Sequence, residues 1–400
     1  MFEYVRDGEV TVDSPLAWLL EPLPVQTFFD ELWEKTHHHL KRDCAGYFDR
    51  VLPGPSAVDE LLKHAAPEPS MLRLVRGKDK READRYRLAD GSLDLARVQE
   101  DFADGHTIIL NGIEQYVPTI ASLAHALEVE LNFPAKVNAY ATPPGSQGFA
   151  PHYDAHNVLI LQIHGSKIWH LYGTPTPPHQ MQSHTAVVAA DLPAPQDVLL
   201  EAGDVFYLPR GVVHSAETTS EPSVHLTIGM HAPSALTLLS HMLYLLSVQD
   251  DRLHRLLPPR HLDDGDARAG IAGLVRDMAD IIEDPDVVAA GLGALEGILV
   301  RRGSCPPVGR VSDAVGIDGH TLVTKHQPLY SRVTPARGGV TLQFAQLSIS
   351  AGADHEAALR FLAGSTEPFR VADLPGLGAT QQTDLARKLI ATGFLVRLPH

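Results

Sequence analysis

The chain is poor in cysteine and has no long uninterrupted apolar run. Two cysteines occur in 400 residues, Cys44 and Cys305. Because they are few and far apart in the sequence, they exclude a cysteine-rich zinc site and a disulfide framework, and they favour a reducing, cytoplasmic compartment. The N-terminus lacks the apolar core of a secretory signal. The most apolar stretch, residues 234–249, is interrupted by Ser and His, which argues against a membrane span.

Positive charge is also scarce, since 33 Lys and Arg stand against 49 Asp and Glu, for a net charge of −16. The first 300 residues carry −20 and the last hundred carry +4. An acidic body argues against broad nucleic-acid binding and suits a basic partner. The apolar content of 44% predicts a globular protein of two or three domains.

The order of predicted elements divides the chain. Short helices are expected at 14–35 and 56–65, followed by short β-rich runs separated by turns between 106 and 231. Serial short strands with almost no helix among them predict an antiparallel barrel or double sheet.

A helical region and a mixed region follow the strands. Two amphipathic helical stretches are expected at 234–257 and 267–302, split by the breaker PPRHLDDGD, and 301–310 is interpreted as a linker. The remaining segment alternates strands and helices in an order similar to a small winged-helix-like α+β unit.

The run APHYDAHNVLILQIHGSKIWHLY, residues 150–172, contains several histidines in a β-like pattern. If it is a strand, His152 and Asp154 project from one face and Tyr153 from the other, because the side-chain period is two. One imidazole and one carboxylate on the same face can bind a metal. His214 is the best candidate for a third ligand.

The segment GDVFYLPRGVVH explains the choice of His214. Gly203 and Gly211 are expected in turns and Pro209 at a strand end, so the histidine begins the next strand at a defined place. Two neutral imidazoles and one carboxylate leave three positions open, which is the ligand set of non-haem Fe(II) sites that activate O₂. Zn(II) is more often held in a closed tetrahedral set.

These motifs resemble those of a known family. PHYD followed by G-x5-P-x-G-x2-H is similar to the two metal motifs of the cupin barrel, and the run as a whole resembles JmjC-type 2-oxoglutarate oxygenases of the ribosomal oxygenase group. The resemblance implies a mainly β catalytic domain at 1–232, a double-stranded β-helix of the cupin jelly-roll type with N-terminal helices. It further implies a helical dimerisation domain at 233–302 and a winged-helix-like domain at 303–400.

The resemblance also implies a co-substrate site. In the family, a basic side chain in LQ-x-x-G-x-K-x-W holds the far carboxylate of 2-oxoglutarate, and Lys167 occupies that place in LQIHGSKIW. A compact ammonium group suits a carboxylate in a partly dry barrel. Asn138 and Tyr140 match the N-x-Y element of VNAY, and Thr227 in HLTIG is a further hydroxyl candidate. The implied cofactors are Fe(II) and 2-oxoglutarate.

The preferred hypothesis is an oxygenase that hydroxylates an arginyl or histidyl side chain of a ribosomal protein, with succinate and CO₂ as co-products, and that acts as a cytoplasmic homodimer. One alternative keeps this chemistry but acts on a peptide natural product or a small metabolite. Another is a winged-helix regulator with a degenerate barrel, in which Arg387 and Lys388 would contact nucleic acid. We favour a scaffold or protein-interaction role for that unit.

The remaining polar candidates are assigned structural roles or left open. A structural or substrate-side role is expected for His156, and surface or packing roles for His164, at a predicted hairpin turn, and His170. The cluster THHHLKR at 36–42 is expected to be structural rather than a metal site. Arg210 is left open between contacting substrate and anchoring its loop.

Overall fold

The computed structural model describes residues 3–6, 9–12, 14–52, 58–59, 61–62, 71–173, 176–177, 192–302, 311–326, 329–336, 338–345 and 347–398. Most of the helix expected at 56–65, and residues 303–310 of the expected linker, lie outside these residues. A short antiparallel pair, β1 (Glu3–Arg6) and β2 (Glu9–Val12), comes first.

The N-terminal stretch forms short helices, as predicted. The Ser14 hydroxyl accepts a hydrogen bond from the backbone N–H of Ala17, and Pro15 occupies the first turn, so both residues favour a helix start. The helical elements of the first 131 residues, with a π-helical turn at Phe28–Leu32, include α1 (Pro15–Leu20), α2 (Val25–Thr27), α4 (Leu95–Ala103) and α5 (Pro118–Leu131). α5 lies between two strands of the larger sheet, in the region where almost no helix was expected.

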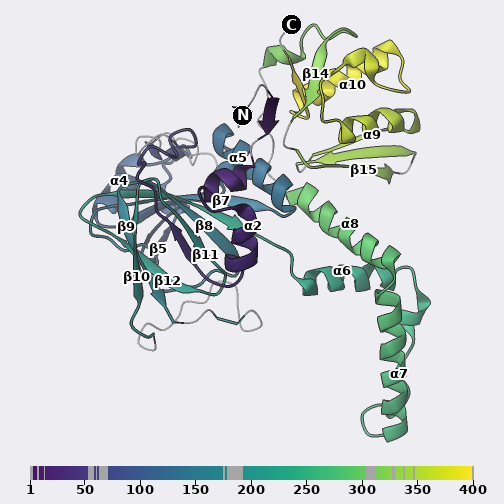
Figure 1. The fold of residues 1–400 in the computed structure, drawn as a ribbon, viewed down its shortest axis with the longest axis horizontal. Helices are drawn as coiled ribbons and strands as arrows, with labels where there is room; N and C mark the ends of the chain where they lie inside the picture. The colour runs from purple at the N-terminus through teal and green to yellow at the C-terminus, as the bar shows by residue number, and fades with distance from the viewer. Residues whose placement is uncertain are drawn as a thin grey trace.

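Eight antiparallel strands form the larger sheet (Figure 1). Their order across the sheet is β3-β11-β8-β13-β7-β6-β4-β5. Their bounds are β3 (His38–Leu40), β4 (Leu72–Arg76), β5 (Asp79–Glu82), β6 (Thr107–Leu110), β7 (Ala135–Thr142), β8 (Asn157–His164), β11 (Val205–Leu208) and β13 (Ser223–Met230).

Three strands form the smaller sheet, in the order β10 (Gln196–Glu201), β9 (Ser166–Tyr172), β12 (Val213–Thr218). The expected double sheet is therefore present, but the hairpin predicted at HGSK is wrong. β8 pairs with β11 and β13, whereas β9 pairs with β10 and β12. Gly165 has φ +64 and lies so close to the Pro222 carbonyl that a Cβ would clash with it, so the chain crosses between sheets at this turn.

The two faces of the larger sheet bury different residues. Helices α1 and α5 cover its outer face, where β7 contributes Ala135, Val137, Ala139 and Ala141 to the main core. Between the sheets lies a smaller apolar cluster that includes Trp169, Leu200 and Phe206. Polar residues at the alternate positions of these strands also point into the space between the two sheets, and the candidate site lies there.

The helical region contains one more helix break than predicted. In place of one helix over 267–302, α7 (Gly265–Ile282) ends before Pro285, which opens α8 (Pro285–Arg302) because proline suits a first turn. α6 (Ala235–Ser247) packs along α8, and Gly291 has no side chain where a Cβ would meet Met242. In Figure 1, α7 projects away from the barrel. No helix in the part of the chain with described coordinates is long and apolar enough to cross a bilayer.

The C-terminal segment forms the predicted succession of strands and helices. One three-stranded sheet has the order β18-β14-β19 and the other β15-β16-β17. Their elements are β14 (Leu322–Lys325), β15 (Ser331–Ala336), β16 (Gly339–Phe344), β17 (Leu347–Gly352), α9 (Glu356–Gly364), β18 (Phe369–Arg370), α10 (Ala379–Ala391) and β19 (Leu395–Arg397). On α10, Arg387 forms an ion pair with Asp384.

Candidate metal and co-substrate site

His152 and Asp154 lie in the loop before β8, so the prediction that they lie on a strand is wrong. His152 makes one isolated antiparallel bridge with His214, and the chain then bends through residues 153–156. Pro151 has no N–H to extend a ladder. Tyr153 is buried, whereas His152 and Asp154 keep part of their surface exposed.

His214 is the second residue of β12, as predicted. Gly203 (φ +98) and Gly211 (φ +82) adopt the left-handed backbone that glycine tolerates, and β11 ends immediately before Pro209. The Gly211 N–H donates a 2.9 Å hydrogen bond to the Asp154 carbonyl. The loop before β12 is thereby joined to the loop that carries the first two candidates.

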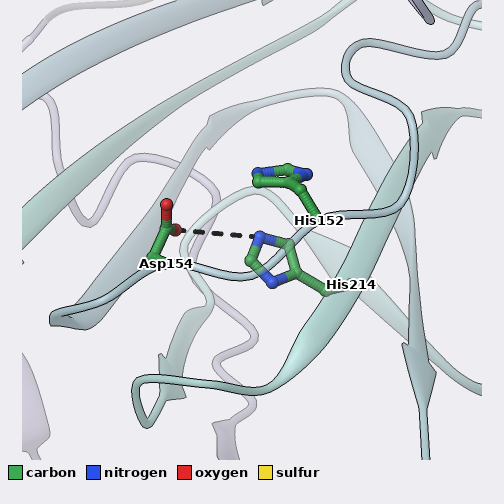
Figure 2. Close-up of side chains that lie close together, drawn as sticks. All are labelled: His152, Asp154 and His214. Atoms are coloured by element: carbon green, nitrogen blue, oxygen red, sulfur yellow. Dashed lines mark ion pairs between the residues drawn. The ribbon is translucent and has the colours of Figure 1, made fainter. Parts of the chain in front are cut away.

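The three candidate ligands converge (Figure 2). One ligand atom from each of His152, Asp154 and His214 lies within 4.8 Å of the others. Nε2 of His214 is 3.9 Å from Oδ2 of Asp154, and the two imidazole centroids are 4.5 Å apart. Residues separated by about sixty positions are thus placed around a single point that an ion could occupy.

Backbone carbonyls orient both imidazoles. Nδ1 of His152 lies 2.9 Å from the Ala150 carbonyl, and Nδ1 of His214 lies 2.9 Å from the Val212 carbonyl. Each Nδ1 donates to its carbonyl, so Nε2 is the ring atom that each histidine can offer to a metal. Burial, reinforced by His214, lowers the pKa of His152 to about 4, so that ring is neutral at neutral pH.

Lys167 is buried in the barrel interior on β9. It faces the same side as Trp169, and Thr218 of β12 is opposite it in the ladder. Its Nζ lies 3.4 Å from Nδ1 of His225, and no carboxylate of the described residues is within ion-pair distance. Burial therefore lowers the pKa of Lys167 to about 7.

The other three co-substrate candidates form one group on the inner face. Thr227 lies opposite Asn138 across β13 and β7, and both side chains act on the Tyr140 hydroxyl. Burial, followed by the charge of Asp154, raises the pKa of Tyr140 more than these two side chains lower it, so its hydroxyl stays protonated. The Asn138 side-chain oxygen also accepts from the Gly112 N–H.

The sequence interpretation missed three interior residues. His225 stacks on Tyr140 with centroids 4.6 Å apart, and burial followed by Lys167 lowers its pKa well below the usual range. Alternation along β13 could have identified it, since it lies two positions from Thr227. The buried Nε1 of Trp169 and Nε of Arg73 have no hydrogen-bond partner within the described parts of the chain.

The secondary candidates lie away from the ligand cluster. His39 pairs with Asp204 at 2.8 Å, which places that residue of the THHHLKR cluster in a structural contact. His170 faces away from Lys167 and pairs with Asp197, and His156 stacks on His231 with centroids 4.4 Å apart. His164 is partly buried at the end of β8.

The barrel region is similar in sequence to known proteins. Residues 114–238 match the JmjC domain. Ribosomal oxygenase 2 of Mus musculus is 30% identical over 292 residues, which are 68% of this chain and 61% of that protein. The bifunctional lysine-specific demethylase and histidyl-hydroxylase NO66 of Drosophila mojavensis is 30% identical over 227 residues, 55% of this chain and 25% of that protein.

Solved structures show the same fold. The ribosomal oxygenase YcfD of Escherichia coli has a TM-score of 0.54 at 18% identity and covers 94% of this chain and 98% of its own. YcfD in complex with cobalt and 2-oxoglutarate has a TM-score of 0.52 at 17% identity, with coverages of 94% and 99%. The chain spans only 61% and 25% of the mouse and fly relatives.

Proposed function

We propose, since residues 114–238 match the JmjC domain, that this chain is an Fe(II)- and 2-oxoglutarate-dependent oxygenase that hydroxylates an amino-acid side chain of a protein. His152, Asp154 and His214 are the proposed metal ligands. Lys167 is the proposed partner of the co-substrate's 5-carboxylate, and Tyr140, Asn138 and Thr227 are proposed to donate or order further hydrogen bonds.

The convergence of two imidazoles and one carboxylate beside a buried lysine carries the proposal. The donor set suits a divalent iron with open positions rather than a closed zinc site. The buried Trp169 N–H and Arg73 Nε–H have no acceptor among the described residues, and the Lys167 ammonium has a 3.4 Å contact with Nδ1 of His225 but no carboxylate partner there. These groups fit a ligand with carboxylate oxygens.

The chain's own residues position and shield the reaction. With Fe(II) bound, O₂ would be the oxidant: one of its oxygen atoms would enter succinate as 2-oxoglutarate is oxidatively decarboxylated with release of CO₂, and the other would be added to the substrate side chain. His152 and His214 would bind the metal through their Nε2 atoms, and Lys167, on the strand paired with β12, would orient the co-substrate. The apolar cluster with Trp169 and Leu171 excludes water between these two points. No protein acid or base is needed.

A ribosomal protein is the proposed substrate, with an arginyl or histidyl side chain as the target. The relatives are named ribosomal oxygenase 2 and histidyl-hydroxylase NO66. Ribosomal proteins are basic, and the acidic first 300 residues of this chain would attract a basic partner. Lysine demethylation, named for the fly relative, is not part of the proposal.

The proposal extends to the domain organisation and the location of the protein. The barrel domain spans 1–232, residues 233–302 form the helical dimerisation domain, and 303–400 form a winged-helix-like domain with a scaffold role. We propose that the protein is a cytoplasmic homodimer. Apolar side chains exposed on α6 support this assembly, among them Leu236 and Tyr244.

The test is turnover with a ribosomal extract. Fe(II), 2-oxoglutarate and O₂ are added, succinate is quantified, and ribosomal proteins are searched for a gain of one oxygen atom. Asp154→Ala should abolish both signals, whereas the exposed Asp197→Ala should retain them. Equal 2-oxoglutarate turnover by wild type and Asp154→Ala would refute the metal assignment. Succinate formation with oxidation of a small molecule instead would favour a metabolite substrate.

A further inference from the structure

The two loops that carry the candidate metal ligands meet at one side chain, Asn157. This residue begins β8 three positions after Asp154 and is buried. Its Oδ1 accepts a 3.1 Å hydrogen bond from the Arg210 N–H, four positions before His214. The same oxygen accepts a 3.1 Å bond from the Tyr207 hydroxyl.

Glu34, far away in the sequence, completes this contact. Its Oε1 accepts a hydrogen bond from Nδ2 of Asn157, and its Oε2 accepts from Nε and a terminal nitrogen of Arg210 at 2.7 and 2.6 Å. Its N–H donates a 3.0 Å bond to the Tyr207 hydroxyl. One carboxylate therefore bridges both ligand loops.

The backbone at Glu34 is held in an unusual conformation to make these bonds. Its φ is +60, in the left-handed region that non-glycine residues seldom adopt. Such conformations persist where surrounding contacts determine them, and they cluster at functional sites. The hydrogen bond from the Gly211 N–H to the Asp154 carbonyl joins the same two loops a second time, close to the candidate ligands.

We propose that Glu34 is a positioning residue for the candidate metal site. By holding Asn157 and Arg210 together, it fixes the separation of the loop before β8 and the loop before β12. The Arg210 guanidinium is thereby assigned to loop anchoring instead of substrate contact. This inference rests on the proposed function, since it takes His152, Asp154 and His214 as the ligands.

Co(II) binding to the metal-free full-length protein tests the inference without turnover. The dissociation constant and the visible absorption of the bound Co(II) are measured for wild type, Glu34→Gln and Arg210→Gln. Loss of groups that orient metal ligands typically weakens binding about 10–100-fold, and we expect each variant to show a loss in this range. A changed absorption spectrum at saturating Co(II) is also expected, because the ligand geometry changes.

Two further variants make the result specific. The double variant E34Q/R210Q should bind Co(II) no more weakly than either single variant, since both remove the same link. Lys41→Gln, which breaks the 3.0 Å pair of Lys41 with Glu201 in the same N-terminal region, should bind as wild type does. Circular dichroism and thermal unfolding identify any variant that fails to fold, in which case the other single variant decides.

The possible outcomes separate this inference from the proposed function. If wild type binds Co(II), Asp154→Ala does not, and both Glu34→Gln and Arg210→Gln match wild type in affinity and spectrum, the positioning role is wrong and the metal site stands. If wild type itself binds no Co(II), or Asp154→Ala binds equally well, the proposed function fails. Additive losses in the double variant would overturn the shared link.

Discussion

At the scale of single residues, the barrel interior holds a cation where burial disfavours its charge. Lys167 has His225 as its polar neighbour, and that ring is itself kept neutral by burial. A bound carboxylate would restore the charge of Lys167, because an opposite charge nearby favours the ammonium form. In the proposed role of Lys167, binding of the co-substrate and protonation of this lysine are therefore linked.

This linkage predicts a pH-dependent affinity for 2-oxoglutarate. The pKa of Lys167 is about 7 in the free protein, so above pH 7 a proton must be taken up as the carboxylate binds. The dissociation constant should rise by up to about tenfold per pH unit above 7, following proton linkage. Calorimetric titration of the Co(II)-loaded protein between neutral and alkaline pH measures this slope.

Lys167→Arg provides the control for the pH profile. Its guanidinium stays protonated throughout this range, so the profile should be nearly flat whatever the absolute affinity. If Lys167→Arg shows the slope of wild type, a different group titrates and Lys167 does not bind the carboxylate.

The same burial predicts that Lys167→Met stabilises the protein without ligands. The pKa is lowered from 10.5 to about 7 on folding, so the unfolded chain binds more protons between these values. The resulting decrease in the free energy of unfolding is complete below pH 7 and disappears as pH rises toward 10.5. Methionine fills the volume of the lysine stem without a charge. Urea denaturation at pH 7 should show a gain of several kcal/mol, since each pKa unit corresponds to about 1.36 kcal/mol.

The gain should shrink at alkaline pH, and 2-oxoglutarate binding should be lost in the same variant. Lys41→Met, at an exposed position, should change the free energy of unfolding by no more than about 0.5 kcal/mol. If Lys167→Met is instead less stable than wild type at pH 7, another buried group already offsets the cost of burying the lysine charge.

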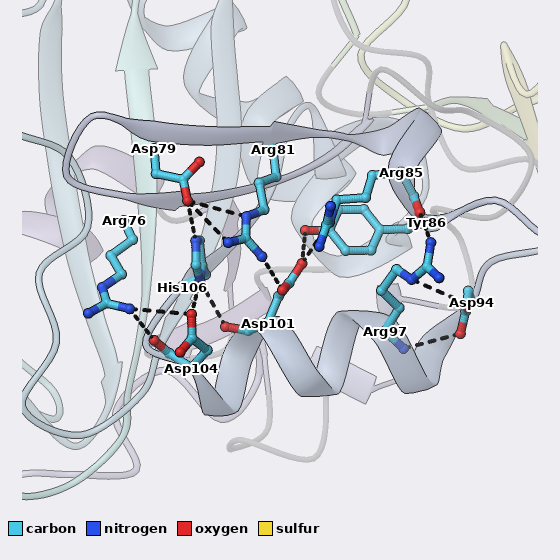
Figure 3. A network of polar contacts seen from close by, with 10 residues as sticks. All are labelled: Arg76, Asp79, Arg81, Arg85, Tyr86, Asp94, Arg97, Asp101, Asp104 and His106. Atoms are coloured by element: carbon cyan, nitrogen blue, oxygen red, sulfur yellow. Dashed lines mark hydrogen bonds and ion pairs between the residues drawn. The ribbon is translucent and has the colours of Figure 1, made fainter.

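At the scale of secondary-structure elements, α4 is attached to the β4 and β5 edge of the sheet by a polar network (Figure 3). Asp101 of α4 accepts hydrogen bonds from Arg81, Arg85 and Tyr86. Burial alone would raise the pKa of Asp101, but the bonds from these three residues outweigh it and lower the pKa to about 2. His106 is buried between Asp79 and the Asp101 carbonyl.

Asp101→Asn should destabilise the fold, because the arginines lose a buried anionic partner. We expect a loss of about 3 kcal/mol at neutral pH, the lower end of the range for breaking a buried ion pair. In wild type this contribution is present above pH 3.8 and is lost as pH falls toward 2. Urea denaturation at pH 7 measures the difference.

Asp104→Asn is the matched control, because Asp104 is 61% exposed and pairs with Arg76 at 3.3 Å. Its loss should cost no more than about 1 kcal/mol. Equal effects of the two variants would show that burial of Asp101 adds nothing to its ion pairs.

The strands and loops also show which features of the fold the sequence pattern could predict. Alternation identified the strands and drew attention to the candidate ligands, and Gly203, Pro209 and Gly211 indicated where His214 would lie. Alternation did not reveal that His152 and Asp154 lie outside a strand. The isolated bridge at His152 and the bend after it still bring two residues that are two positions apart toward the same point. Nor could it assign β8 and β9 to different sheets, since a glycine turn serves a hairpin and a crossover alike.

At the scale of the whole molecule, contacts distant in sequence were the least predictable. The glutamate that joins the ligand loops lies in the N-terminal helical stretch, and nothing in the local pattern at Glu34 points to Asn157 or Arg210. Alternation could have placed His225 on the inner face of β13, but its stacking on Tyr140 depends on how β13 lies against β7. Such pairings follow from sheet order, which periodicity does not encode.

The helical region supplies the last prediction, on assembly. α6 packs its Met242 side against α8, while Leu236, Leu243 and Tyr244 remain exposed. Apolar patches of this kind mark protein interfaces, and the proposed homodimer would cover them. Leu236→Glu with Leu243→Glu should therefore convert dimer to monomer in sedimentation velocity, because charges would be buried without partners. Leu199→Glu, at an exposed position on β10, should leave the dimer intact. A wild type that sediments as a monomer, or a double variant that stays dimeric, would rule out this interface.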